Sequence, residues 1–333
     1  MLLVSATADR EPGPRWTSDR LARRSGRALA SPLALTLRAD QATADTAWAV
    51  VEAVFADIDR AMSRFREDSE LTALCRRSPG PVDVASRMLV RALTAADRAR
   101  RVTNGRFDPR IVAALERIGY AGVPQDGPPS HRPRTAASRV LVRDGRRGPI
   151  SLPEPVDLGG IGKGLALRWA AAAIDRLIAA AGRPCEIAGY LLDAGGDIVM
   201  DGSPADGEPW HIGIEDPAGE AGPVATLRAS GRLAVATSSI RRLRWQVGGR
   251  EVHHLIDPGT GEPGGAGLVA VTVAGPDPAW AEVWSKALFL EGADGIAAVA
   301  RSRGLAAWWV TEAGILEMTA AARARTTWVA AET

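Results

Sequence analysis

Lysine is almost missing from this chain. Of 41 basic residues in a chain of 333, lysine stands only at positions 163 and 286, so the other 39 are arginines. Such a bias suggests a coding sequence that drifts to arginine wherever either residue serves. Lys163 and Lys286 therefore mark candidate positions for a compact ammonium charge that a guanidinium does not replace, with chance survival as the alternative.

Cysteine, strong net charge and long apolar runs are scarce as well. Cys75 and Cys185 are too few for a disulfide framework or a cysteine metal site, and we expect both to be reduced packing residues. A net charge of +2 gives no electrostatic reason to expect nucleic-acid or membrane binding. Acidic residues and prolines interrupt the start, and no segment could span a membrane, so we predict a cytoplasmic protein with a disordered arm over residues 1–27.

Apolar periodicity then predicts a mixture of helices and strands. Helical spacing covers residues 43–63, 84–102, 111–118, 278–291 and 293–303, whereas strand patterns dominate residues 210–273 and 305–318. Residues 124–133, rich in proline, glycine and serine, predict a surface loop. Because strands and helices do not alternate as βαβ units, we predict an α+β fold with one domain over residues 28–320 and a tail over residues 321–333.

The most informative stretch runs from Val156 to Ala166, where four glycines fall within six positions ahead of an alanine-rich run. A strand into Asp157, a glycine turn and a helix start is the natural interpretation. Free N–H groups at a helix start favour anions, and Lys163 adds a positive charge. We therefore consider a phosphate or nucleotide cradle, with a tight structural turn as the alternative. The glycine spacing matches neither a P-loop nor a dinucleotide fingerprint.

Three further groups of residues could take part in chemistry. His253 and His254 end a predicted strand on opposite faces, so at most one faces a given site, as a general base or as a structural histidine. Glu282 and Lys286 share a helix face and can pair, although a surface ion pair is the alternative.

Asp193 and Asp197 flank Gly195-Gly196 within residues 191–200, which read as one interrupted strand. Two acids of one site are possible there. The alternative is that one carboxylate caps the turn and the other faces water.

These stretches belong to an ordered set of short motifs: Ser63…Phe65…Ser69-Glu70-Leu71, Gly105-x-Phe107-Asp108-Pro109, Asp157-Leu158-Gly159-Gly160-Ile161-Gly162-Lys163-Gly164, Asp193-Ala194-Gly195-Gly196-Asp197-Ile198, Thr237-Ser238, His254-Leu255-Ile256-Asp257-Pro258-x-Thr260-Gly261-x-Pro263 and Ala281-Glu282…Ala287-Leu288. In this order and number they resemble the FAD:protein FMN transferase family (ApbE-like flavin transferases). The likeness spans residues 28–318, nearly the whole chain.

The resemblance implies a single T-fold-like domain of mixed, largely antiparallel sheets packed with helices. It implies FAD as the substrate, a divalent cation, usually Mg²⁺, and transfer of FMN to a serine or threonine of an acceptor flavoprotein with release of AMP. His254 matches the residue that activates the acceptor hydroxyl, and Gly160, Glu282 and Ser285 match the metal site. The FAD-contacting positions that the resemblance implies are Phe65, Arg106, Phe107, Asp108, Asp157, Lys163, Thr237, Ser238 and Leu255. Our own hypothesis adds Lys286, which would pair with Glu282 and reach the phosphates.

Three departures from the family pattern qualify this reading. Where the family usually has aspartate and threonine as metal ligands, this chain has Glu282 and Lys286, and a protonated lysine has no lone pair for a cation. Either Ser285 substitutes, or the ammonium takes the place of the metal, which would weaken or abolish magnesium dependence. The chain also has Thr237-Ser238-Ser239 for Thr-Ser-Gly and Ala30-Ser31 for Gly-Thr.

Three functions stay open at this stage. They are FMN transfer, hydrolysis of FAD to FMN and AMP, and flavin binding without catalysis. The pairing of His254 with Asp257 in one motif favours transfer, and the Glu282 and Lys286 substitutions favour the non-catalytic protein.

Overall fold

The structure, a computed structural model, describes residues 3–4, 21–78, 80–82, 86–120, 139–143, 150–180, 187–205, 207–219 and 222–330. Cys185 and the predicted loop at residues 124–133 lie outside these ranges. The helices are α1 (Gln41–Met62), α2 (Glu70–Arg76), α3 (Arg87–Val102), α4 (Val112–Arg117), α5 (Gly162–Ala180), α6 (Pro278–Phe289), α7 (Gly292–Ser302) and α8 (Ala320–Arg323). The strands are β1 (Leu3–Val4), β2 (Leu21–Ala28), β3 (Ser31–Arg38), β4 (Gly80–Val82), β5 (Val142–Arg143), β6 (Ile150–Leu152), β7 (Gly189–Ala194), β8 (Asp197–Gly202), β9 (Trp210–Glu215), β10 (Pro223–Ala229), β11 (Leu233–Ser239), β12 (Arg244–Val247), β13 (Arg250–His253), β14 (Leu268–Gly275), β15 (Ala306–Thr311), β16 (Leu316–Met318) and β17 (Thr326–Val329).

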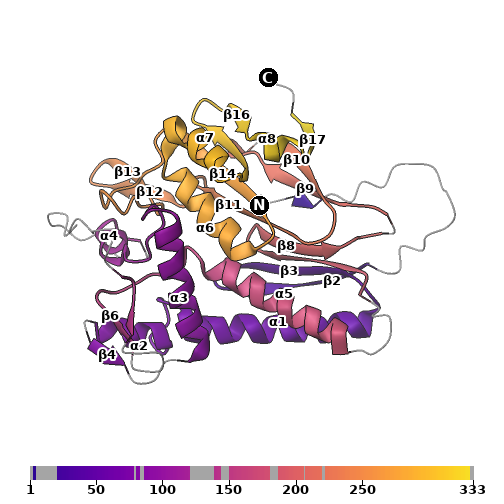
Figure 1. Ribbon diagram of the computed structural model, residues 1–333, viewed down its shortest axis with the longest axis horizontal. Coiled ribbons are helices and arrows are strands. Elements are labelled where there is room, and N and C mark those ends of the chain that lie inside the picture. The colour runs from indigo at the N-terminus through magenta and orange to yellow at the C-terminus, as the bar shows by residue number, and fades with distance from the viewer. Residues whose placement is uncertain are drawn as a thin grey trace.

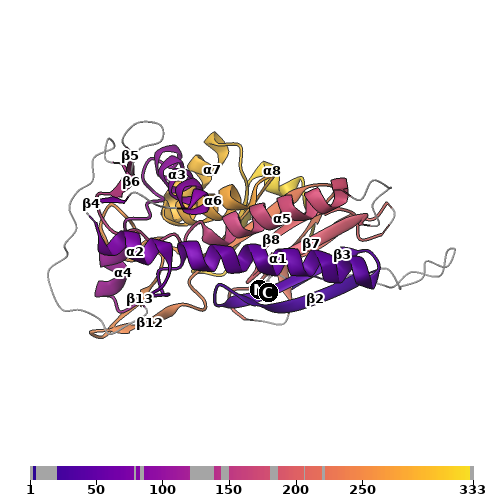
Figure 2. The ribbon, with the colours of Figure 1, turned by 90° about the horizontal axis from the view of Figure 1, so that it is seen from below.

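Two antiparallel sheets and a layer of helices build the body of the molecule. The eight-stranded sheet has the order β16-β15-β14-β11-β8-β7-β3-β2, and the four-stranded sheet has the order β1-β9-β10-β17. The helices α1, α5 and α6 lie side by side against the eight-stranded sheet (Figures 1 and 2). The predicted α+β class with largely antiparallel strands is therefore confirmed.

Alternation along the strands divides the core between the two faces of the large sheet. Leu192 and Val199 pack with the helices, whereas Leu191 and Met200, their sequence neighbours, pack toward the four-stranded sheet. This period of two is what a strand buried on both faces requires. Both faces of β7 and β8 are therefore covered, which fixes the register of these two strands on either side of Gly195-Gly196.

The hairpin β7–β8 corrects one expectation. Residues 191–200 form two antiparallel strands instead of one interrupted strand, because Gly195 and Gly196 adopt φ values of +67° and +97°. Positive φ at both central residues is what a two-residue hairpin turn needs. Ala30, in the place of a usual glycine, also has a positive φ of 58° in the turn between β2 and β3.

The predicted domain, residues 28–320, is too short at both ends. Strand β2 begins at Leu21 and pairs with β3 over its full length, so residues 21–27 are part of the main sheet instead of a disordered arm. Its arginines, which alternate poorly with apolar residues, hid the strand from a periodicity argument. At the other end, β17 pairs with β10 inside the stretch that was predicted to be a tail.

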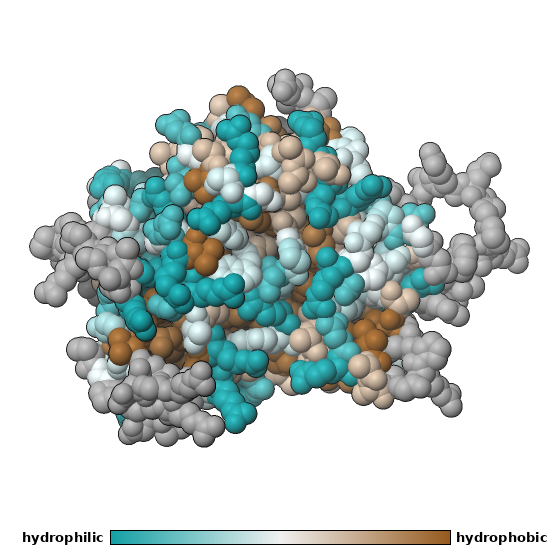
Figure 3. Space-filling model, viewed as in Figure 1, coloured by the Kyte–Doolittle hydropathy of each residue, from teal (hydrophilic) through white to brown (hydrophobic). Residues whose placement is uncertain are grey.

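The surface shown in Figure 3 is mostly hydrophilic, with hydrophobic side chains in small separate patches. Within the described ranges, no helix combines the length and the hydropathy that a membrane crossing needs. The predicted helices at residues 43–63, 84–102, 278–291 and 293–303 correspond to α1, α3, α6 and α7.

Candidate active site

The glycine turn leads directly into α5. The carbonyl oxygen of Leu158 accepts the N–H groups of Ile161 and Gly162 at 3.1 and 2.8 Å, which closes the turn. The predicted strand into Asp157 is absent, because β6 already ends at Leu152 and residues 153–158 are irregular. At Gly164 the helix backbone approaches α6 so closely that a Cβ there would lie 2.5 Å from Cα of Ala279. The turn and α6 are thus held together at the start of α5.

Glu282 links the two helices. Its side chain is fully buried, and its Oε2 accepts the backbone N–H of Gly164 at 2.8 Å. Its Oε1 accepts a hydrogen bond from Nζ of Lys286 at 3.2 Å. The stem of Lys286 runs past Gly160, where a Cβ would lie 3.3 Å from Cδ of the lysine. The sequence motif around Gly160 and the Glu282 helix therefore meet in space.

The second lysine lies on the other side of the same turn. Lys163 forms an ion pair with Asp197, which is buried and also accepts the N–H of Thr237 at 3.1 Å. Burial would lower the pKa of Lys163, but the charges of Asp197 and Glu282 outweigh it and raise the pKa, so the ammonium stays protonated.

Asp193 caps the hairpin turn by accepting the N–H of Gly196 at 2.7 Å, so one of the two carboxylates is a turn cap, as expected. Burial raises the pKa of this carboxyl group. Asp197 does not face water, which overturns the other half of that alternative, because its oxygens are taken by Lys163 and Thr237.

Hydroxyl groups of β11 form hydrogen bonds to α6 and to β14. The hydroxyls of Ser238 and Ser285 lie 2.8 Å apart, and the Ser285 hydroxyl donates to the carbonyl oxygen of Glu282 at 2.9 Å. The hydroxyl of Thr237 pairs in the same way with that of Thr272, at 2.9 Å. Ser238 and Ser285 are buried, so these hydrogen bonds satisfy groups that water does not reach.

Asp157 anchors the beginning of the glycine turn. Its Oδ2 lies 2.8 Å from Nε of Arg64 in an ion pair, and its Oδ1 accepts the N–H of Gly159 at 2.5 Å. Burial raises the pKa of Asp157, against the opposing charge of Arg64. The guanidinium of Arg64 also stacks on Phe65, 4.7 Å from the ring centroid, and this phenyl ring is 61% exposed.

His254 faces this group of residues, and His253 does not. The imidazole of His254 stacks on Tyr120, with centroids 6.1 Å apart, whereas His253 packs edge-on against Phe289 of α6. Burial lowers the pKa of His254 to about 4, and the positive charges of Lys286 and Lys163 act in the same direction. The imidazole is therefore neutral at physiological pH. Its Nδ1 lies 3.5 Å from the carbonyl oxygen of Leu243, which accepts only, so Nε2 is the nitrogen that keeps a lone pair.

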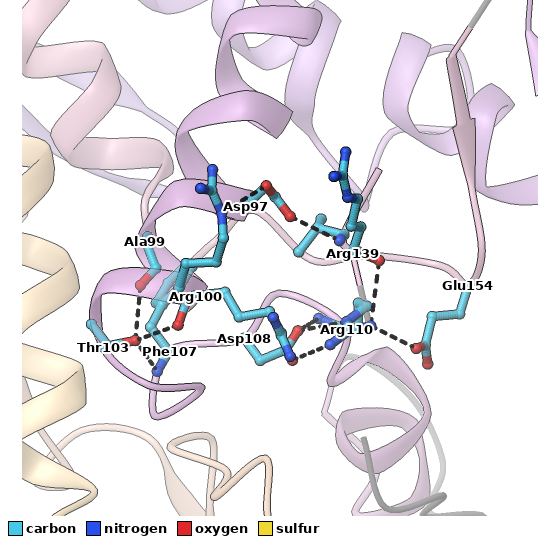
Figure 4. Close-up of polar contacts among 11 residues, drawn as sticks. Asp97, Ala99, Arg100, Thr103, Phe107, Asp108, Arg110, Arg139 and Glu154 are labelled. Atoms are coloured by element: carbon cyan, nitrogen blue, oxygen red, sulfur yellow. Dashed lines mark hydrogen bonds and ion pairs between the residues drawn. The ribbon is translucent and has the colours of Figure 1, made fainter. Parts of the chain in front are cut away.

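A buried ionic cluster fixes the turn that carries Phe107 (Figure 4). Asp108 pairs with Arg110 at 2.6 Å and with Arg100 at 3.2 Å, and Arg110 also reaches Glu154 at 3.5 Å. A Cβ at Gly160 would lie 2.9 Å from the Phe107 ring, so this turn forms one wall of the site. The carboxylate of Asp108 is bound within the cluster, which favours a structural role over direct contact with a ligand.

Two other expected contacts lie at the margin of the site. Arg106 pairs with Asp257 at 3.3 Å and with Glu291 at 3.2 Å, and its side chain is 38% exposed. The side chain of Leu255 is buried among residues of β14 and α6. Its backbone carbonyl accepts the N–H of Gly264 at 3.0 Å.

Sequence reasoning missed Arg64 and Tyr120. Arg64 joins Asp157 to two aromatic rings, and its guanidinium donates to the Tyr120 carbonyl at 3.3 Å. Tyr120 stacks on both His254 and Trp245. The chain has only two tyrosines, and Arg64 sits between the quoted Ser63 and Phe65, so both residues offered a weak signal.

The donor set at Glu282 does not fit a magnesium ion. Both oxygens of this carboxylate are engaged, the Ser285 hydroxyl is bound to neighbours, and an ammonium stands beside Gly160. Magnesium is usually bound through one or two carboxylates, with waters and substrate phosphates completing an octahedron, and the one carboxylate here is already paired with an ammonium. Among the residues described, no group of three or more histidine, cysteine or acidic side chains is placed to hold a metal ion.

The sequence and the fold match known proteins over most of their length. The sequence model of the ApbE family matches residues 30–309. The FAD:protein FMN transferase of Klebsiella pneumoniae is 28% identical over 289 residues, covering 83% of this chain and 79% of that protein. The one from Haemophilus influenzae is 27% identical, covering 81% and 79%.

Solved structures show the same fold at lower identity. The ApbE protein of Thermotoga maritima superposes with a TM-score of 0.79 at 23% identity, covering 92% of this chain and 99% of that one. The apo flavinyl transferase ApbE of Pseudomonas stutzeri gives a TM-score of 0.77 at 24% identity, covering 92% and 97%.

Proposed function

The chain belongs to the ApbE family, and on that basis we propose that it transfers the FMN half of FAD to a serine or threonine hydroxyl of an acceptor protein and releases AMP. One observation carries the proposal beyond the family. The start of α5, which carries Lys163, is linked to the helix with Glu282 and Lys286 through the hydrogen bond from Gly164, and the charges of both lysines act on His254. A pyrophosphate bound at this junction would face two ammonium groups and one neutral imidazole.

The reaction breaks one phosphorus–oxygen bond and makes another. The acceptor hydroxyl oxygen attacks the phosphorus atom on the FMN side, and its proton passes to Nε2 of His254. The bond to the AMP phosphate breaks, and its electron pair leaves with AMP. A base that is neutral at the working pH is needed, and the pKa of His254, lowered to about 4, keeps the imidazole in that form.

Charge that builds up on the phosphate oxygens needs preorganised donors. Lys163 and Lys286 supply them as ammonium groups, each held by a buried carboxylate, Asp197 or Glu282. Because these donors are already oriented, little reorganisation is needed as the bond breaks.

The flavin ring needs an aromatic or apolar surface. We assign it to Phe65, whose exposed ring stacks on the Arg64 guanidinium that pairs with Asp157. Phe107 is buried and supports the turn at Gly160 from behind. Thr237 and Ser238 offer further polar contacts from β11. A cytoplasmic location stays a prediction from the sequence.

Two products separate the three candidate functions. The protein is incubated with FAD and a protein extract, AMP is measured by chromatography, and covalent flavin is read as fluorescence of denatured protein bands. AMP with a fluorescent band supports transfer. AMP with free FMN alone would mean hydrolysis, and unchanged FAD would mean binding without catalysis.

A matched pair of histidine variants ties transfer to the site. His254→Asn should abolish covalent flavin while FAD binding is retained, because it removes the proton acceptor. His253→Asn should keep transfer, since that imidazole packs against Phe289 and away from both lysines. Equal activity of the two variants would contradict the assignment of His254.

A further inference from the structure

We infer that the ammonium group of Lys286 takes the place of a divalent cation in this site, so that the protein binds the diphosphate of FAD without metal. The inference rests on the proposed function, because it concerns how that substrate is held. It goes further by assigning to one residue of this chain the charge that a bound cation would supply.

The geometry around Glu282 is the first support. A fully buried carboxylate needs a partner for its charge, and here Lys286 supplies it at 3.2 Å while Gly164 N–H binds the other oxygen at 2.8 Å. Each carboxylate oxygen already accepts one hydrogen bond, and the ammonium 3.2 Å from Oε1 would repel a second cation at this carboxylate. Ser285, the other candidate ligand, donates its hydroxyl proton to the Glu282 carbonyl.

The orientation of Lys286 is the second support. An ammonium has three N–H donors, and Glu282 is its one hydrogen-bonding partner among the described residues. The remaining two donors are available for phosphate oxygens. The side chain is 18% exposed, so it is neither sealed in the core nor free in solvent.

Glycine at position 160 gives this lysine its path. A Cβ there would lie 3.3 and 3.5 Å from Cδ and Cε of Lys286, and 2.9 Å from the Phe107 ring. Contacts under about 3.4 Å are tighter than side chains normally accept. The absence of a side chain at Gly160 thus lets the lysine stem lie directly against the turn that would hold the phosphates.

The composition of the chain is an independent support. Only two of 41 basic residues are lysines; Lys163 directly follows this turn in the chain, and the stem of Lys286 lies against Gly160 within it. A guanidinium is planar and wide, whereas an ammonium is a compact point charge, closer in shape to a metal ion. A chain that uses arginine elsewhere keeps lysine where that shape is needed.

Equilibrium FAD binding with and without metal is the direct test. Binding to the whole protein is followed by flavin fluorescence in EDTA and in millimolar Mg²⁺. We expect dissociation constants that agree within about twofold, since no metal site must be filled. Binding that weakens at least tenfold in EDTA would overturn the inference and leave the proposed function standing. No FAD binding in either buffer would overturn the proposed function, and the inference with it.

Variants at position 286 sharpen the test. Lys286→Met should weaken FAD binding at least about tenfold in both buffers, because a charge-assisted hydrogen bond is lost. Arg168→Met is the matched control, since it removes a cation that joins the same two helices through Asp277. It should leave FAD affinity within about twofold of wild type. An Arg168→Met variant that loses as much affinity as Lys286→Met would refute a specific role for Lys286.

Lys286→Thr tests the same inference through a gain of metal binding instead of a loss of FAD binding. It frees Oε1 of Glu282 and adds a hydroxyl oxygen, so Mn²⁺, read by electron paramagnetic resonance, should bind this variant and not the wild type. Tight Mn²⁺ binding by the wild type would contradict the inference, as would a Lys286→Thr variant that binds no Mn²⁺. Circular dichroism confirms folding, and if either variant is unfolded the wild-type comparison in EDTA decides.

Discussion

Replacing Gly164 with alanine should destabilise the protein by about 1.5–5 kcal/mol. The added Cβ would lie 2.5 Å from Cα of Ala279, 2.6 Å from the carbonyl oxygen of Pro278 and 2.8 Å from the Ala279 nitrogen. All three are backbone atoms, so no rotamer change relieves the contact, and α5 and α6 must separate by roughly 1 Å.

The magnitude follows from two losses and one gain. Overpacking of this kind costs about 1–3 kcal/mol. Separation also lengthens the 2.8 Å hydrogen bond from Gly164 N–H to the buried carboxylate of Glu282, and a hydrogen bond to a charged group is worth about 1.5–3 kcal/mol. The higher helix propensity of alanine returns about 1 kcal/mol.

The matched control lies two residues earlier in the same turn of α5. A Cβ at Gly162 would meet only Cε of Met62, at an ordinary 3.8 Å. Gly162→Ala should therefore leave stability unchanged or raise it by up to about 1 kcal/mol. Urea denaturation followed by tryptophan fluorescence measures both. If the two variants unfold at the same urea concentration, the close approach of α5 to α6 is not a constraint and the reasoning fails.

Three further outcomes are expected. The pKa of His254, lowered to about 4, predicts that transfer at saturating FAD persists to about pH 5 and falls below it. In Lys286→Met the fall should move to higher pH, because a nearby positive charge that lowers the pKa of His254 is gone. A pH–rate profile measures both, and an unmoved profile would mean that the charge of Lys286 does not act on His254. Because His254 has a lower pKa folded than unfolded, the unfolded chain also binds the proton first, so stability should drop as pH falls from about 6.5 to 4. Arg110→Met should lower the free energy of unfolding, measured by urea denaturation, by about 3–5 kcal/mol, because Asp108 loses a buried partner. Arg60→Met breaks an exposed ion pair and should cost under about 1 kcal/mol. Similar losses in the two variants would show that the buried cluster stabilises the protein no more than the exposed pair does.

Much of the fold could be predicted from periodicity alone. Helix α1 repeats its apolar residues at helical spacing, and the structure places them on one buried face, as with Val51, Phe55 and Ile58. The glycine turn was recognisable because four glycines ahead of an alanine-rich run have few other interpretations. Both features are local, so a short window of sequence contains the whole signal.

What escaped prediction depends on contacts between distant residues. One of the two aspartates beside Gly195-Gly196 was expected to face water, yet Asp197 is buried and pairs with Lys163, 34 positions away. Arg64 meets Asp157 and Tyr120 only once α1, the glycine turn and α4 have packed. A single sequence carries no local signal for such pairs. Strand β2 escaped prediction for a local reason instead, because its arginines break the apolar alternation.

The arginine-rich strand β2 has a consequence for how the protein behaves in a crowded cell. It is the last described strand on its side of the eight-stranded sheet, next to β3 with its buried leucines. The unpaired backbone N–H and C=O groups of an edge strand can form hydrogen bonds with a strand of a second molecule, and repulsion between like charges opposes that pairing. Arg23 and Arg27 are exposed on β2, so a second copy that approached this edge strand against strand would meet like charges.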